Sequence, residues 1–148
     1  MVAAAGFVAC ASQTPVQPNP TVTFQVDPAA TYTIQQLVDQ ARAGDTILVH
    51  PGSYTQRVVI NKPGLKLQGD HAVLEGQGGG LGGTGFGIHI KGVSDVEVSG
   101  FTVQHFERGI VLENATNCRV RSNEVRENTA KTAPPFVVGI TSFEGIVS

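Results

Sequence analysis

The chain has 148 residues, of which 41% are hydrophobic, 15% are charged and 18 are glycine, and its formal net charge is −2. This length is enough for one domain and too short for two. The charges are scattered, without the basic stripe of a nucleic-acid-binding protein or the polybasic segment that binds an anionic membrane. We therefore expect no nucleic-acid partner. Low charge, abundant glycine and the lack of tryptophan favour a β-rich fold with many turns.

The first residues are small and apolar, and they end near Cys10. This run is shorter than the roughly 20 residues of a membrane span and resembles the end of a secretory signal. The sequence FVAC at residues 7–10 is similar to the lipobox of bacterial lipoproteins, in which the cysteine is lipidated, whereas ACA at residues 9–11 fits ordinary signal cleavage. We predict an exported protein of the periplasm, cell surface or medium. Residues 1–11 are then a signal or lipobox-like segment, and the lipid anchor at Cys10 is one of two alternatives.

A polar, proline-rich stretch over residues 12–30 is predicted to be a linker, and residues 31–148 to be the folded domain. The domain opens with a helix over residues 34–42. Thr33 and Gln36 have the spacing of a capping box, and apolar residues recur at helical spacing on one face. Gly44 is the expected helix stop, because glycine enters the left-handed conformation at little cost.

From about residue 45 the pattern changes to short β-branched runs, which are closed by glycine, proline or asparagine. These runs lie at residues 46–50, 57–60 and 65–69. Eight of the thirteen residues in 75–87 are glycine, which predicts a loop. The Gly-Lys-Ser/Thr ending of a phosphate-binding loop is missing there, so we expect no nucleotide cofactor.

Two consecutive segments, Gly87–Arg108 and Gly109–Ala130, repeat the same hydrophobic pattern over 22 residues each. Within each segment apolar residues alternate in twos and stop at turn residues, as short strands with alternate inward side chains require. A period near 22 is typical of one coil of a parallel β-solenoid, in which like residues stack on successive coils.

Outward positions support the same register. Stacking at this period brings together three pairs of residues whose charges are opposite, or become opposite when His105 is protonated. Like charges at these positions would repel, so the pairs support this register. These pairs are Lys91 with Glu113, Glu97 with Arg119, and His105 with Glu127.

The segment TIQQLVDQARAGDTILVHPGSYTQRVVINKPGLKLQGD, followed by the two repeats, resembles right-handed parallel β-helix proteins of the pectin-lyase-like superfamily. The resemblance covers about residues 31–130. It implies an all-β fold, a right-handed parallel β-helix with about 22 residues per coil and an N-terminal amphipathic capping helix. It also implies a connection with carbohydrate, because many members are lyases, hydrolases or epimerases of acidic polysaccharides, while others bind ligands or assist assembly of envelope proteins.

No catalytic residue of those enzymes can be carried over, because the family's catalytic groups lie on later coils. Asp70-His71 is the most attractive polar pair, but a solvated turn is the favoured interpretation since no third partner is evident. His50 is expected in a turn and His89 to face outward over Val111. Asn123 is expected to point inward at a bend and to bond to the backbone. No cluster of His, Cys and Asp has the spacing of a metal site.

The segment after Asn128 contains two prolines and then VVGITSFEGIVS, which could begin another coil but offers no evident cap. We therefore expect a β-helix truncated at its C-terminal end, which can self-associate through the uncapped coil. Three functions remain open: a structural or glycan-binding module, the first part of a polysaccharide-acting enzyme whose catalytic coils are missing, and an assembly factor for an envelope protein.

Overall fold

The computed structural model describes residues 20–76, 85–126, 128 and 145–147. These residues form an all-β protein made of parallel sheets with one short helix, which confirms the predicted fold class at that level. Sheet A contains eight strands: β1 (Thr23–Val26), β2 (Thr46–Val49), β3 (Gly52–Tyr54), β5 (Lys66–Glu75), β7 (Glu97–Gln104), β9 (Cys118–Arg121), β10 (Glu124–Arg126) and β11 (Gly145–Val147). Sheet B contains β4 (Val58–Ile60), β6 (Phe86–Lys91) and β8 (Arg108–Glu113).

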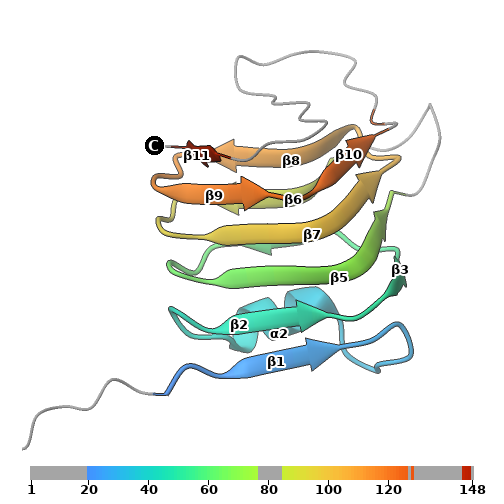
Figure 1. Cartoon of the computed structure of the whole chain (residues 1–148), viewed down its shortest axis with the longest axis horizontal. Helices are drawn as coiled ribbons and strands as arrows, with labels where there is room; N and C mark the ends of the chain where they lie inside the picture. The colour runs from blue at the N-terminus through green and yellow to red at the C-terminus, as the bar shows by residue number, and fades with distance from the viewer. Residues whose placement is uncertain (1–19, 77–84, 127, 129–144, 148) are drawn as a thin grey trace, which may run out of the picture.

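The strands of sheet A are stacked in the order β1, β2, β5, β7, β9, and the strands of sheet B lie behind them in the order β4, β6, β8 (Figure 1). All of these neighbours are parallel. The chain passes through the short helix between β1 and β2, and through sheet B between β2 and β5, between β5 and β7, and between β7 and β9. Inward side chains of both sheets form one hydrophobic core, in which Ile88, Ile90, Leu67 and Val98 are fully buried.

The predicted register is confirmed in both sheets. Ile88 pairs with Ile110 in sheet B and Val98 pairs with Val120 in sheet A, each 22 residues apart. Buried β-branched and aliphatic residues therefore lie directly above one another, where they pack most closely.

Asn123 occupies the inward position that its alignment with Phe101 predicted. Its side chain is buried, its Oδ1 accepts a hydrogen bond from the Phe101 N–H at 3.0 Å, and its Nδ2 donates to the Val98 carbonyl at 2.9 Å. Asn128 makes the same pair of bonds to Phe106 and Val103. Asparagine amides thus replace ladder hydrogen bonds where the chain bends between strands.

The predicted helix is present as α2 (Ile34–Gln40), and the capping box of Thr33 and Gln36 forms as expected. The helix ends earlier than predicted, because Ala41 is its C-cap in an extended conformation. Gly44 has a positive φ of 89° but lies in the turn into β2 rather than at the helix end.

The helix covers the free edge of β4, which would otherwise expose unpaired backbone groups. The amide of Gln35 imitates a neighbouring strand: its Oε1 accepts from the Val59 N–H at 2.7 Å and its Nε2 donates to the Val59 carbonyl at 3.2 Å. At the corresponding edge of sheet A the hydroxyl of Tyr32 donates to the Gln25 carbonyl of β1 at 3.1 Å. The helix therefore covers the edge of β4, and the Tyr32 hydroxyl satisfies one carbonyl on the edge of β1.

Two features differ from what the sequence predicts. Strand β1 lies inside the segment that was predicted to be a linker over residues 12–30, and it pairs along its whole length with β2. The buried Asp45 fixes this pairing, because its Oδ1 accepts from the Val22 N–H and its Oδ2 from the Arg42 N–H, both at 2.8 Å. At the other end, where no cap was evident, β11 pairs antiparallel with β9.

Candidate functional site

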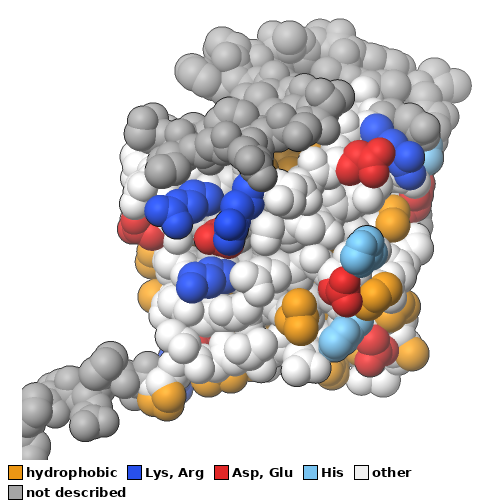
Figure 2. Space-filling view, viewed as in Figure 1, with side chains coloured by type: hydrophobic (Ala, Val, Ile, Leu, Met, Phe, Trp, Pro, Cys, Tyr) orange, Lys and Arg blue, Asp and Glu red, His pale blue; other side chains and the backbone are white. Residues whose placement is uncertain are grey.

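The outward face of sheet A carries polar side chains in two columns, because alternate residues of each strand point to the same side. Moving from β2 through β5 and β7 to β9, the first column is Thr46, Lys66, Glu97 and Arg119, and the second is Leu48, Gln68, Ser99 and Arg121. Figure 2 shows lysine and arginine side chains gathered around an acidic one on the left of this face, with histidine side chains on its right. Each column carries an arginine on β9.

Glu97 lies beside Arg119 in the register, as predicted, but its ion pair is formed with Arg121. Arg121 donates to Glu97 Oε1 from Nε at 3.1 Å and from the terminal nitrogen at 2.5 Å. A long side chain reaches a diagonal neighbour as easily as the directly opposite one, so alignment alone does not select the partner. The arginine covers the carboxylate, whose side chain is only 12% exposed.

Lys66 and Arg119 are left on either side of this pair. Both are exposed, and neither forms an ion pair with another described residue. They line one open cavity of about 210 Å³, together with Glu97 and two turn residues, Asp95 and Asn117. The cavity therefore presents two available cations and several hydrogen-bonding groups to solvent.

Asp95 marks the end of this cavity where β7 begins. Its carboxylate accepts hydrogen bonds from the Ser94 hydroxyl at 2.8 Å and from the Asn117 amide. These two bonds, the one from Ser94 foremost, hold the pKa of Asp95 below its usual value. Asp95 is therefore a fixed negative charge at the rim of the cavity.

A second cavity, of about 270 Å³, lies where sheet A bends. Strand β5 has a bulge there: Gln68 pairs with Ser99, and pairing resumes only at Ala72 with Phe101, so three residues of β5 face one residue of β7. Asp70 and His71 belong to this bulge and project from it, with 55% and 92% of their side chains exposed. The bulge removes them from the ladders that account for the other outward charges.

The imidazole of His71 is oriented by its neighbour, because Nδ1 lies 2.8 Å from Asp70 Oδ1. A proton on Nδ1 leaves Nε2 as a free acceptor toward solvent. Thr102, Ser122 and Glu124 line the same cavity. Asp70 and His71, which were expected in a solvated turn, thus have polar neighbours that lie far from them in the sequence. None of these three described neighbours forms a hydrogen bond with Asp70 or His71.

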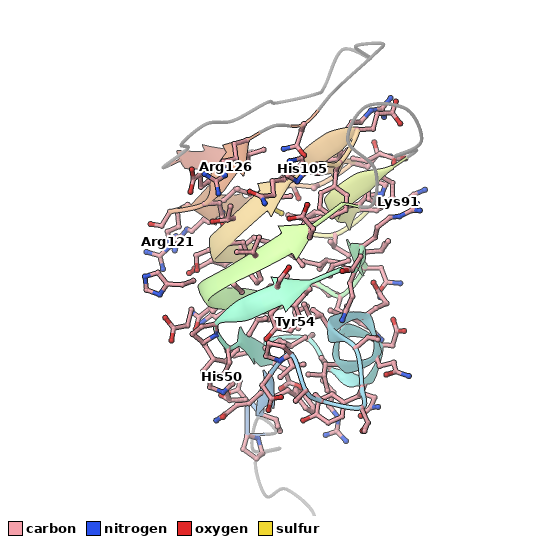
Figure 3. All side chains as sticks on the ribbon, turned by 90° about the vertical axis from the view of Figure 1, so that its right-hand side faces the viewer. His50, Tyr54, Lys91, His105, Arg121 and Arg126 are labelled. Carbon is pink, nitrogen blue, oxygen red and sulfur yellow. The ribbon has the colours of Figure 1, made fainter. Side chains whose placement is uncertain are left out.

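A third cluster lies beside the bend at the C-terminal end of β5, on the side seen in Figure 3, where His105 and Arg126 lie near one another. Glu75 contacts His105 Nδ1 and accepts from Gln104 Nε2 at 2.7 Å, and Arg126 donates to Gln104 Oε1 at 2.8 Å. The bond from Gln104 is the main cause that lowers the pKa of Glu75. The predicted partner of His105, Glu127, lies outside the described residues.

On sheet B the predicted pair of Lys91 and Glu113 is confirmed, with 3.7 Å between Nζ and Oε1. His89 lies over Val111 as predicted, but its side chain is only 10% exposed. Its ring lies against Phe86, with 4.3 Å between ring centroids, and its Nε2 approaches Glu113 Oε2 at 2.9 Å without hydrogen-bond alignment. This histidine therefore packs as part of the sheet and leaves little surface for a ligand.

The remaining candidates are structural or lie outside the described residues. His50 is placed in the turn after β2, where its Nε2 lies 3.1 Å from Gln25 Oε1. Cys118 is buried, and burial is the main cause that raises the pKa of its thiol. Cys10, the predicted lipidation site, lies outside the described residues. Among those described, no group of three His, Cys, Asp or Glu side chains could hold a metal ion.

Comparison with known proteins gives one informative similarity. No family model matches the chain, and no solved structure matches it. The Cell surface glycoprotein of Methanothermus fervidus is 29% identical to it over 95 residues, which cover 63% of this chain and 15% of that protein. Within the described part of the chain, no helix is long and apolar enough to cross a membrane.

Proposed function

We propose that the chain forms a right-handed parallel β-helix in an exported, surface-associated protein, and that the outward face of sheet A binds glycans. The 22-residue offset between β6 and β8 and between β7 and β9, together with the helix over the edge of β4, supports the solenoid. The similarity to a cell surface glycoprotein supports the location. A structural or binding module at the surface would expose this face to polysaccharides.

The observation that carries glycan binding is the open cavity between Lys66 and Arg119. Lys66 and Arg119 form no ion pair with another described residue, and both are exposed. A ligand can therefore bind them at little desolvation cost. Carboxylate groups of acidic sugars would bind the cations, and the neighbouring side-chain amide and carboxylate groups would accept or donate hydrogen bonds to sugar hydroxyls.

The experiment is calorimetric titration of the whole chain with acidic and neutral oligosaccharides, using the double substitution Lys66→Gln and Arg119→Gln. We expect acidic oligosaccharides to bind, with an affinity that falls as salt rises, and the double substitution to weaken binding by roughly ten-fold. Arg57→Gln is the matched control, because Arg57 is an exposed cation directly before β4 of sheet B. Equal affinities for the wild type and the double variant would overturn the proposal.

A second candidate function is hydrolysis of a glycan substituent, and the bulge at Asp70 and His71 favours it. An imidazole oriented by a carboxylate is a general base suited to activating water near neutral pH. The test is product analysis by mass spectrometry after incubation with acetylated oligosaccharides, comparing the wild type with His71→Gln and with the control His50→Gln. The hypothesis predicts acetate release by the wild type and the control and its loss in His71→Gln, and it fails if all three proteins behave alike.

A further inference from the structure

Charges alternate along the first outward column of sheet A. Lys66, Glu97 and Arg119 are directly paired on β5, β7 and β9, so the signs along the stack are positive, negative, positive. Adjacent parallel strands lie about 4.8 Å apart, which places the backbone positions of Lys66 and Arg119 about 9.6 Å apart along the stack, one on each side of Glu97. Thr46 precedes them on β2, so the column offers no further cation in that direction.

The middle position is closed to an anion. Glu97 is already bound by Arg121, and its carboxylate side chain is 12% exposed. A ligand carboxylate at that level would lie against a filled ion pair, whereas a neutral hydroxyl could approach it without repulsion. An anionic group of a ligand therefore makes a favourable contact with a cation at the level of β5 and at the level of β9, but not at the level of β7.

The direction of the ligand follows from Asp95. Its carboxylate lies at the rim of the same cavity where β7 begins, so an anionic chain running along the strands would pass a fixed negative charge. A chain running across the strands, along the stack, meets Lys66 and Arg119 instead. An extended pyranose chain advances by nearly one strand spacing per sugar, so these two cations match every second sugar.

We propose that this face selects acidic glycans that carry their charge on alternate sugars, bound along the stack with successive carboxylates on Lys66 and Arg119. This inference rests on the proposed glycan binding and adds the spacing of charge as the property that is recognised. Glu97 is the positioning residue for this selection, since it occupies the level of β7 between the two cations and disfavours an anion there.

The test compares two acidic probes of equal carboxylate number and one neutral probe. Hyaluronan oligosaccharides carry a carboxylate on every second sugar, oligogalacturonates carry one on every sugar, and maltohexaose carries none. We expect the wild type to bind the hyaluronan oligosaccharide about five-fold more tightly than the oligogalacturonate, as expected for one unfavourable charge contact. Maltohexaose is expected to bind more weakly than both.

Two variants separate this selection from general charge attraction. Glu97→Gln is expected to bring the two acidic probes to within about two-fold of each other, while Glu113→Gln on sheet B leaves their ratio unchanged. Thr46→Lys places a cation next to Lys66, and it is expected to improve oligogalacturonate binding more than hyaluronan binding. Thr46→Lys retains the ion pair of Glu97 and Arg121, so the test does not depend on the folding of Glu97→Gln.

The outcomes distinguish the two levels of the hypothesis. If neither acidic probe binds, the proposed function fails and this inference fails with it. If both bind with equal affinity, or if the oligogalacturonate binds more tightly, glycan binding stands and the spacing rule is wrong. A preference for hyaluronan that survives both Glu97→Gln and Thr46→Lys would likewise overturn the role given to the column.

Discussion

Replacing Asn123 should destabilise the fold more than any comparable change at the surface. The Asn123 side chain is 6% exposed and makes one hydrogen bond to the Phe101 N–H and one to the Val98 carbonyl. In Asn123→Ala the buried N–H of Phe101 loses its acceptor, which costs about 1–3 kcal/mol, and loss of the second bond adds about 1 kcal/mol. We expect a decrease in the free energy of unfolding of about 2–4 kcal/mol.

Urea denaturation followed by circular dichroism measures this change. A loss of this size should also lower the Tm by about 6–13 °C. Asn61→Ala is the control, since Asn61 is exposed in a turn and should change stability by less than about 0.5 kcal/mol. If Asn123→Ala unfolds at the same urea concentration as Asn61→Ala, the amide does not replace ladder hydrogen bonds and the explanation of the bend is wrong.

Three further predictions concern the other contacts that hold the stack. Gly100→Ala should lower the free energy of unfolding by about 3 kcal/mol or more, because a Cβ there would lie 1.9 Å from a backbone oxygen at a φ of 78°. Gly92 also has a positive φ but faces open space, so Gly92→Ala should cost only about 1 kcal/mol. Equal Tm values of the two variants in thermal melts would refute the clash. Gln35→Leu should uncover the edge of β4 and speed amide hydrogen exchange along this strand. Gln40→Leu, at the exposed end of the helix, should leave the exchange unchanged. Unchanged exchange in both variants would refute the capping role. The pKa of Asp45 is lowered chiefly by the hydrogen bond from the backbone N–H of Val22, directly before β1. Its contribution to stability is therefore complete above the ordinary carboxyl pKa of about 4 and is lost as the pH falls through the lower folded value. Tm measured from pH 6 to pH 2 should therefore fall less steeply in Asp45→Asn than in the wild type, and parallel curves would contradict this.

The register was predictable because the constraint that creates it is visible in the sequence. A 22-residue period places like apolar residues on one another, so the pairs of Ile88 with Ile110 and Val98 with Val120 follow from counting. The inward position of Asn123 follows from the same count. The helix start was predictable for a different reason, since a capping box needs only two residues at fixed spacing.

The parts that could not be predicted depend on geometry that spacing does not encode. Strand β1 has only four residues and follows a proline-rich stretch, so its pattern is too short to distinguish it from a linker. The bulge at Asp70 breaks the count in β5 and so conceals its own neighbours, Ser122 and Glu124. Arg119 and Arg121 are both within reach of Glu97, so the register does not predict which of them forms the ion pair. The side-chain positions show that it is Arg121.

The central claim is that acidic glycans bind on the outward face of sheet A between Lys66 and Arg119. Amide chemical shifts of the ¹⁵N-labelled chain, recorded while hyaluronan oligosaccharide is added, locate the ligand directly. The account predicts that the largest changes fall on residues 66, 97 and 119 of β5, β7 and β9, while β6 and β8 of sheet B remain unchanged. Shifts confined to sheet B, or none at saturating oligosaccharide, would contradict it.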